Sequence, residues 1–280
     1  MAFAIKVPLF PFHTWLPNAH VEAPTAGSVI LAGVLLKMGT YGFFRFAMPL
    51  FPQAFLYFQP ALLILCVIGI VYGALVAMVQ TDIKKLIAYS SVSHLGVVML
   101  GLFSLNLTGV TGGLYQMLNH GISTGMLFLI VGMIYERTHS REIAAHSGLA
   151  KIFPVTTFLF LVATLASIGL PLTNGFIGEF LSFTGTFQKY PVYALIGATS
   201  VVLGAIYMLW LIQRFFFGEQ KIPGGSSHDS PVHDLNKREI FILIPLVVLV
   251  FWMGIYPKTF LDKLERPVHE LVERMKKFEM

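Results

Sequence analysis

The sequence predicts an all-α protein, a polytopic bundle of transmembrane helices. Of the 280 residues, 56% are hydrophobic and only 12% are charged, and the mean hydropathy is +0.75. Soluble domains have far more charge than this. Several apolar stretches also reach the roughly 18 residues that a helix needs to cross a hydrocarbon core about 30 Å thick. These observations exclude an ordinary soluble domain.

Seven stretches are long enough to be complete spans, with predicted limits at 25–45, 59–80, 86–105, 111–135, 154–188, 192–217 and 239–256. The fifth is too long for one straight helix and contains Gly169, Pro171, Asn174 and Gly175. Because proline and glycine break helices, we expect one discontinuous helix, with halves at 154–170 and 176–188. Such a break is tolerated at membrane depth only inside protein or beside a wet cavity.

The two ends of the chain differ from the spans. Residues 1–7 are apolar but cover only half a span, and they predict a partial first span rather than a signal peptide. Near the C-terminus, apolar residues recur at three- and four-residue steps: Leu261, Leu264, Val268, Leu271, Met275 and Phe278. This spacing predicts an amphipathic helix on the membrane surface or on a neighbour. We therefore divide the chain into a transmembrane domain at 1–257 and a surface helix at 258–280, with a Gly/Ser/Pro-rich linker at 222–231.

Basic residues predict the orientation. Nine lie in connections on one side, namely Lys84, Lys85, Arg137, Arg141, Lys151, Arg214, Lys221, Lys237 and Arg238. Before the C-terminal tail, the other side has only Arg45 and Lys189. The positive-inside rule predicts that the nine face the cytoplasm or an equivalent compartment. Because they flank apolar runs and lack interleaved aromatic residues, the net charge of +5 does not indicate a nucleic-acid partner.

The ionisable residues within the spans are Lys37, His94, His120 and Glu179, with Lys6 in the partial first span. A charged side chain at a helix centre costs about 2.5 to 3.5 kcal/mol on insertion scales, so such groups usually face a bundle interior and serve a function. Each also has a structural explanation. The lysine can form a structural pair, the histidines can be satisfied core residues, and Glu179 can cap the second half-helix.

Taken together, these five residues predict a proton-conducting polar axis. The single Cys66 cannot supply a disulfide or a cluster, and the loop histidines His139, His146, His228 and His233 lack the spacing of a metal site. We expect no cofactor or metal in this chain. The energy for pumping must therefore come from a partner or from a counter-ion gradient.

Long motifs add a specific resemblance. They occupy residues 6–20 (KVPLFPFHTWLPNAH), 23–28 (APTAGS), 35–39 (LLKMG), 80–90 (QTDIKKLIAYS), 93–94 (SH), 119–121 (NHG) and 171–179 (PLTNGFIGE). The sequence resembles the antiporter-like subunits of respiratory complex I, and the carboxylate of Glu179 is similar to that of the M-type (NuoM) subunit. Mrp cation/proton antiporters and membrane-bound hydrogenases contain close relatives.

The resemblance covers only the later half of such subunits, which consist of two inverted five-helix repeats. The six preceding helices are not matched, nor is the intramembrane Glu that normally pairs with the position of Lys6. The resemblance implies that Lys6 is the central lysine of the first half-channel and Lys37 the connecting lysine. It also implies that His94 and His120 form the central relay and that Glu179 is the exit-side group.

The implied function is that of a proton-translocating membrane subunit of an NADH:quinone oxidoreductase, which belongs to an enzyme (a translocase) but performs no redox step itself. NADH, FMN, Fe-S clusters and quinone are then expected in partner subunits. The expected partners are other membrane subunits and the lipid bilayer, and the expected location is the bacterial inner (plasma) membrane. The alternatives are a subunit of a Mrp-type antiporter or membrane-bound hydrogenase, or a non-conducting fragment.

Overall fold

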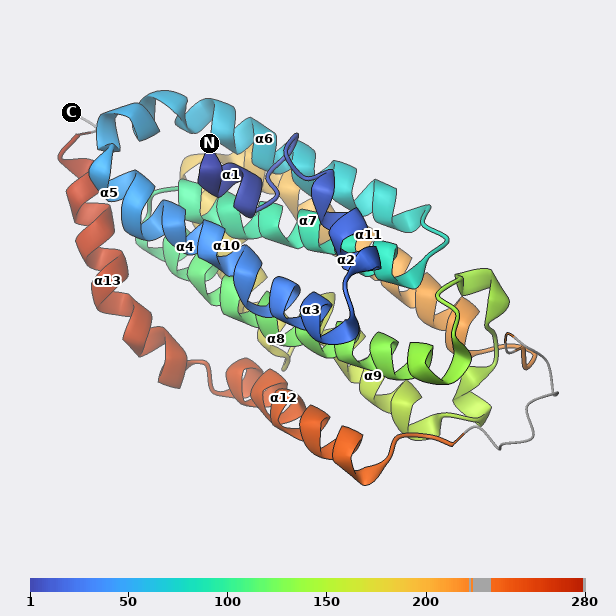
Figure 1. Cartoon of the computed structure of the whole chain (residues 1–280). Coiled ribbons are helices and arrows are strands. Elements are labelled where there is room, and N and C mark those ends of the chain that lie inside the picture. The colour runs from blue at the N-terminus through green and yellow to red at the C-terminus, as the bar shows by residue number, and fades with distance from the viewer. Residues whose placement is uncertain (222, 224–232, 279–280) are drawn as a thin grey trace.

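The computed structural model describes residues 1–221, 223 and 233–278, and every regular element among them is a helix (Figure 1). The predicted all-α fold class is therefore confirmed. Apart from residue 223, the predicted linker at 222–231 lies outside the described residues.

Six continuous helical stretches in the described part of the chain are long and apolar enough to cross a membrane. They are Thr25–Leu50, α6 (Pro52–Met78), α7 (Ile83–Phe103), α8 (Leu107–Thr138), α11 (Pro191–Phe216) and α12 (Lys237–Ile255). The remaining predicted span is broken into α9 (Pro154–Ser167) and α10 (Asn174–Lys189). The protein is thus a multi-pass membrane bundle with the predicted discontinuous helix. Most helix limits lie within four residues of the predicted ones, but the first span ends at Leu50 rather than 45 and α6 begins at Pro52 rather than 59.

The stretch Thr25–Leu50 is not a regular α-helix. Its α-helical pieces are α3 (Thr25–Ile30), α4 (Leu36–Gly42) and α5 (Met48–Leu50), and two π-helical turns join them, η1 (Leu31–Leu35) and η2 (Phe43–Ala47). Single π-helical turns are rare and often lie at functional sites. The first of them ends two residues before Lys37.

Two short helices precede this stretch, α1 (Ala2–Lys6) and α2 (Trp15–Glu22). α1 packs against α4, and α2 packs against α7. The proline-rich segment between them is irregular because proline has no N–H to donate to a helix. The indole Nε1 of Trp15 donates to the carbonyl of Ile5 at 3.1 Å, which brings the two short helices together.

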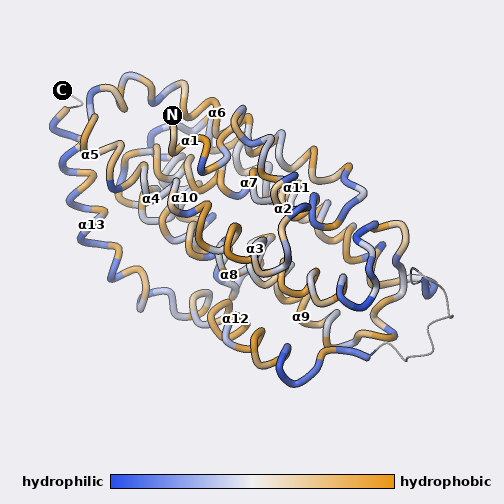
Figure 2. The backbone as a smooth tube through the Cα atoms, viewed as in Figure 1, coloured by the Kyte–Doolittle hydropathy of each residue, from blue (hydrophilic) through white to orange (hydrophobic). Residues whose placement is uncertain are grey.

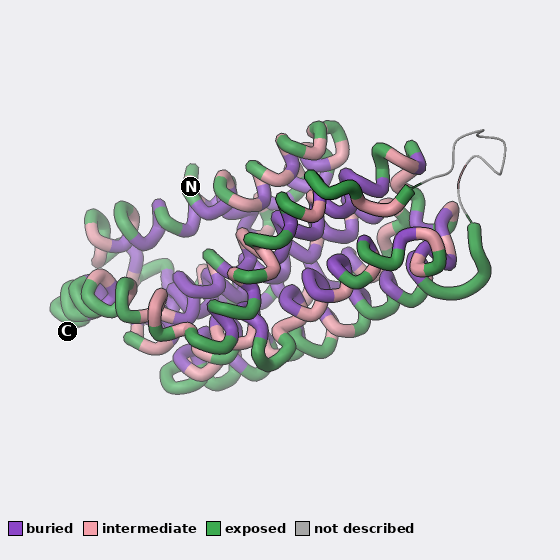
Figure 3. Tube along the Cα trace, turned by 90° about the horizontal axis from the view of Figure 1, so that it is seen from below, coloured by how far each residue is buried: buried purple, intermediate pink, exposed green. Residues whose placement is uncertain are grey.

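α7 lies at the centre of the bundle, where it packs against α6, α8 and α10. Every residue from 90 to 105 is buried, and Figure 3 shows the buried segments gathered in the interior. A polar side chain on such a helix needs a partner inside the protein, because leaving it unpaired costs several kcal/mol. His94 stands in the middle of this stretch.

α8 and α10 approach each other closely along a seam of small residues. A Cβ atom added at Gly112 would lie 2.3 Å from the backbone nitrogen of Ser182, and one added at Gly185 would lie 2.1 Å from that of Gly109. Only glycine fits at such distances. This close contact brings the side chains of α8 within reach of Glu179 on α10.

The start of the broken span is held by residues that lead into α12. The carboxylate of Asp234 accepts hydrogen bonds from the backbone N–H groups of Val155 and Thr156, at 2.7 and 3.2 Å. At the end of α8, Arg137 forms a two-point ion pair with Glu239 of α12, at 2.9 and 2.7 Å. These bonds join α8, α9 and α12 at one end of the bundle and fix where α9 begins.

Hydrophilic segments lie at both ends of the bundle, drawn in blue in Figure 2. The connections that carry the nine basic residues lie at one end, and α13 (Lys258–Lys276) lies at the other (Figure 1). α13 packs against α5 and α8 and buries Val268, Leu271, Val272 and Met275. The predicted amphipathic helix therefore exists, and the apolar face it buries lies on this chain's own bundle.

Candidate functional site

The break between α9 and α10 is shaped around Glu179. Gly169 has a positive φ of 72°, which glycine adopts without strain. A Cβ atom at this position would lie 3.0 Å from Oε2 of Glu179, so a larger residue would press on the carboxylate. A Cβ atom at Gly175 would lie 2.1 Å from the carbonyl oxygen of Ala166. The Gly and Pro residues that predict the break also let its backbone close around this acidic group.

Glu179 is 5% exposed and has two polar partners from other helices. Its Oε1 lies 3.1 Å from Nδ1 of His94 on α7 and accepts a hydrogen bond of 3.1 Å from Nε2 of Gln116 on α8. α10 begins at Asn174, so Glu179 lies beyond the first turn. The alternative that Glu179 merely caps this half-helix is therefore wrong.

His94 uses both ring nitrogens. When Nδ1 carries the proton, it donates to Glu179, and Nε2 is then free to accept from Oγ of Ser167 at 3.3 Å. Ser167 is the last residue of α9, so His94 touches both halves of the broken span. On its other side, the ring centroid of His94 lies 5.8 Å from that of His120.

His120 lies between His94 and Lys37. Its Nδ1 is 2.6 Å from Nζ of Lys37, and because an ammonium group only donates, Nδ1 accepts. A neutral His120 then carries its proton on Nε2, which is buried and has no hydrogen-bond partner among the described residues. A buried N–H without a partner is costly, so Nε2 is suited to meet a water molecule or a neighbouring acceptor.

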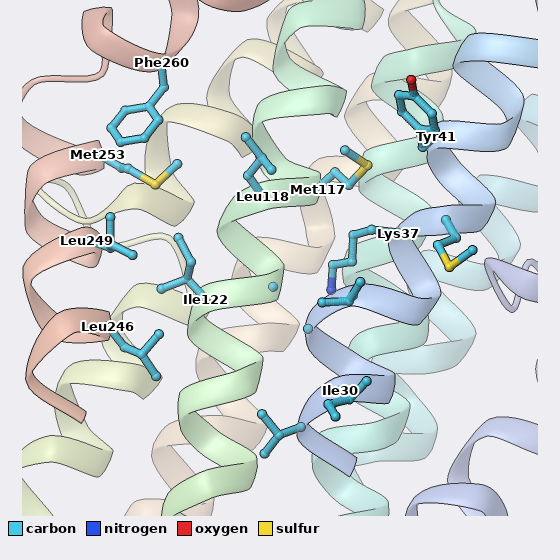
Figure 4. Close-up of a pocket in the computed structure, with 15 residues that line it drawn as sticks. Ile30, Lys37, Tyr41, Met117, Leu118, Ile122, Leu246, Leu249, Met253 and Phe260 are labelled. Carbon is cyan, nitrogen blue, oxygen red and sulfur yellow. The ribbon is translucent and has the colours of Figure 1, made fainter. Parts of the chain in front are cut away.

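Lys37 is 8% exposed, and its ammonium group also donates to the carbonyl of Ala32 in the first π-helical turn. Close approach of two backbones places Lys37 beside His120. A Cβ atom at Gly121 would lie 2.9 Å from the carbonyl oxygen of Gly33 and 3.6 Å from Cε of Lys37. The lysine lines an apolar groove of about 660 Å³, across which Figure 4 shows the apolar side chains of α12.

Four predicted residues thus form one row, Lys37, His120, His94 and Glu179, and each comes from a different membrane segment. Lys6 does not join this row. It is half-buried at the end of α1, and its ammonium group makes no hydrogen bond or ion pair within the described part of the chain. The role of Lys6 stays a prediction.

Two buried basic residues, His20 and Lys84, are not among the predicted site residues. Nζ of Lys84 donates to the carbonyl of Ala23 at 3.1 Å and approaches that of His20 at 3.5 Å. The ring of His20 stacks on Phe128 at 4.3 Å, and neither of its nitrogens has a hydrogen-bond partner among the described residues. These two residues place further buried basic groups at the end of the bundle where α7 begins. The sequence signal was present, because both residues stand in the long motifs, but Lys84 also fits the pattern of a topology signal.

A set of side-chain amides ties the break to α8. Nδ2 of Asn119 donates to the carbonyl of Asn174 at 2.7 Å and to Oε1 of Gln116 at 3.2 Å. Gln116 in turn donates to Glu179. The amides thus connect the first residue of α10 to the carboxylate of Glu179. They also hold the start of α10 against the turn of α8 that carries His120.

A row of buried ionisable groups that ends on a broken helix, inside an apolar bundle, defines the class of antiporter-like membrane proteins. The family model described as "NADH:quinone oxidoreductase/Mrp antiporter, TM" matches residues 1–209. The chain belongs to this family.

Two relatives are each 48% identical to the chain. An NADH-ubiquinone oxidoreductase chain 4 of Marchantia polymorpha matches over 275 residues, and an NADH-quinone oxidoreductase subunit M of Rickettsia prowazekii (strain Madrid E) over 272 residues. These matches cover 98% and 97% of this chain and 55% of each relative, so the chain spans about half the length of these relatives. The resemblance to M-type subunits is confirmed.

Solved structures share the fold. Respiratory complex I from Thermus thermophilus with bound NADH contains a chain that is 40% identical, with a TM-score of 0.90, and the match covers 98% of this chain and 57% of that one. A chain of the Mrp complex from Dietzia sp. DQ12-45-1b has a TM-score of 0.89 at 21% identity, over 99% of this chain and 59% of that one. The similarity to the Mrp chain shows the fold alone. Membrane subunits of the complex I family carry no cofactors themselves.

Proposed function

We propose that the chain forms the proton-relaying part of an M-type membrane subunit of an NADH:quinone oxidoreductase, a translocase. The observation that carries the proposal is the row from Lys37 through His120 and His94 to Glu179. The names of the 48% identical relatives, subunit M and chain 4 of this enzyme, support the choice of enzyme.

The atoms of the row suggest how a proton moves. Lys37 gives a proton from its ammonium group to Nδ1 of His120, and His120 releases the proton that it carries on Nε2. His94 accepts on Nε2 and gives its Nδ1 proton to Oε1 of Glu179. Each histidine thus receives on one nitrogen and releases from the other, which is the usual property of an imidazole shuttle. The 5.8 Å between the ring centroids is a gap that one water molecule or a ring movement closes.

Glu179 is then the group that releases the proton on the side of α13. It lies against the break, where the backbone is not helical, and broken helices in transporters line the wet cavities through which ions pass. Lys84 and His20 supply protons from the basic end of the bundle in this scheme. We propose Lys6 as a lysine of a separate half-channel, as the resemblance implies.

The row conducts but does not supply energy. Moving one charge against 100 mV costs about 2.3 kcal/mol. We propose that this energy comes from partner subunits that hold NADH, FMN, Fe-S clusters and quinone, through contacts with other membrane subunits. The relatives are both bacterial and mitochondrial, and we propose the bacterial inner membrane as the location. In this scheme residues 1–257 form the translocating domain and residues 258–280 a surface helix.

Replacement of Glu179 by Gln in the assembled complex tests the proposal. Glu179→Gln keeps the shape of the side chain and an oxygen for the bond from Gln116, but it cannot bind a proton. We expect proton translocation, measured by dye quenching in vesicles, to fall by about tenfold or more, while the complex still assembles. Glu136→Gln is the matched control, because Glu136 is exposed at the end of α8 and outside the row. Full translocation by the Glu179 variant would show that this carboxylate is not a relay.

A further inference from the structure

A small polar pocket lies where α5 meets α13, at the end of the bundle that has few basic residues. Its volume is about 350 Å³, and its lining includes Arg45, Arg274 and Glu270 together with the apolar Phe44, Leu50 and Leu271. Arg45 comes from the second π-helical turn and Arg274 from the last turn of α13. Two arginines that are far apart in the sequence therefore meet at one membrane boundary.

The two guanidinium groups carry charge that the described residues do not neutralise. Both arginines are exposed, and neither makes a hydrogen bond or an ion pair within residues 1–221, 223 and 233–278. The one carboxylate in the lining, Glu270, is paired with Arg266 at 2.9 Å. The pocket thus offers two unpaired guanidinium groups, and the planar guanidinium matches phosphate oxygens with two parallel hydrogen bonds.

The surroundings of the pocket favour a phosphate that carries acyl chains. An adjoining pocket of about 430 Å³ shares Arg274 and is lined by Leu50, Phe51 and Phe278. These three side chains are 62%, 64% and 42% exposed. Leu50 and Phe51 stand where one span ends and α6 begins, and Phe278 follows the end of α13, so all three lie at this end of the bundle, the level of the headgroups in a bilayer. A free phosphate ion would use the arginines but not this apolar edge.

We propose that Arg45 and Arg274 bind the headgroup phosphate of an anionic phospholipid, whose acyl chains lie along Leu50 and Phe51. The lipid bridges the end of the first complete span and α13, so that it fastens the C-terminal helix to the bundle. The proposal also explains the charge of Arg45, which stands five residues before the end of the helical stretch Thr25–Leu50. It does not depend on the proton relay.

Lipid binding to the purified, delipidated complex tests the proposal. Phosphatidylglycerol is added back to the complex, and native mass spectrometry counts the lipid molecules bound. The same titration with zwitterionic phosphatidylcholine gives the comparison. We expect the double variant Arg45→Gln/Arg274→Gln to lose at least about tenfold in affinity for phosphatidylglycerol, because it loses two charge-assisted contacts. The control is Lys258→Gln/Lys263→Gln, which removes two exposed charges from α13 outside either pocket and should leave binding unchanged.

Several results would overturn the proposal. One is equal retention of phosphatidylglycerol by the double variant and the wild type. Another is competition by inorganic phosphate as effective as that by the lipid, since this would indicate a site for the free ion. Cross-linking of the Arg274→Cys variant to a neighbouring subunit, with no lipid bound, would assign the arginines to a protein interface. If the double variant does not assemble, the single variants Arg45→Gln and Arg274→Gln carry the same test.

Discussion

Lys37 is the first residue of the proposed relay, at the end of the row opposite to Glu179. Its ammonium group makes two hydrogen bonds, to a backbone carbonyl and to an imidazole, and it has no carboxylate partner among the described residues. A purely structural lysine in an apolar bundle would be expected to form an ion pair. Lys37 instead contacts His120, whose Nδ1 can accept the proton from the ammonium group and bind it covalently.

Substitutions of Lys37 separate the effect of its charge from its capacity to transfer a proton. Lys37→Arg retains the positive charge, but an arginine essentially never deprotonates, so it cannot pass a proton to His120. We expect both Lys37→Ala and Lys37→Arg to lower proton translocation by about tenfold or more in dye-quenching assays. Lys151→Ala, at an exposed position near the start of α9, is the control. Full transport by the arginine variant would make Lys37 an electrostatic fixture.

His146 gives a second prediction, in the loop between α8 and α9. Burial lowers the pKa of His146, although the nearby Glu142 opposes this shift through its carbonyl, 2.8 Å from Nδ1, and through its charge. The ring also packs on Phe215 at 4.6 Å between centroids. Because the unfolded loop binds a proton at higher pH than the folded loop does, the folded loop loses stability as the pH falls through about 6.5.

Hydrogen exchange of residues 139–153 measures this effect. We expect faster exchange at about pH 5.5 than at pH 7.5 once the intrinsic rates are corrected, and a smaller difference in His146→Gln. His139→Gln, which alters an exposed histidine of the same loop, should keep the wild-type difference. Protection that does not change with pH in the wild type would contradict the assignment of a buried neutral His146.

At the scale of helices, the seam between α8 and α10 determines whether Gln116 and Glu179 can meet. Gly112 lies against the backbone of α10, whereas Gly125 on the same helix has nothing within 4 Å of an added Cβ atom. The packing of α8 therefore requires glycine at position 112 but not at position 125. The two substitutions test the seam within one element.

We expect Gly112→Ala to destabilise the protein by about 1 to 3 kcal/mol, because the added methyl group overpacks a backbone contact. Gly125→Ala should be neutral or stabilising by about 0.4 to 1 kcal/mol, because alanine favours helix. Thermal unfolding of the purified complex would compare them. The displaced α10 should also weaken translocation in the first variant. Equal stability of the two variants would mean that α8 and α10 are not in close contact.

For the whole molecule, the basic residues predict which end faces which compartment. The nine-residue basic set lies at the end where α9 begins, opposite to α13. The single cysteine, Cys66, is buried. In a Cys66→Ser background, a thiol reagent can therefore label only a cysteine introduced at a chosen position. Exposed positions are available at both ends, Glu219 after α11 and Asp262 on α13.

A membrane-impermeant maleimide applied to intact cells should label Asp262→Cys and not Glu219→Cys, because the positive-inside rule places Glu219 in the cytoplasm. In inverted vesicles the labelling should be the reverse. The wild-type Cys66 serves as the buried control and should remain unlabelled in both preparations. Labelling of Glu219→Cys from outside intact cells would reverse the proposed direction of proton release.

Sequence patterns alone predict the spans, the break and the inventory of ionisable residues. These are local properties: the length of an apolar run, the helix-breaking chemistry around Pro171, and the presence of a charge in that run. The spacing of apolar residues likewise predicted α13, although it did not include Val272 in the buried face.

Which of these residues meet depends on how the helices pack in three dimensions. Periodicity gives the face of a helix, but contact between helices depends on their rotation and separation. These are set by long-range packing such as the approach of Gly33 to Gly121. For this reason the structure joins Lys37 to His120 and leaves Lys6 outside the row. The same packing places Oε1 of Glu179 3.1 Å from both Nδ1 of His94 and Nε2 of Gln116.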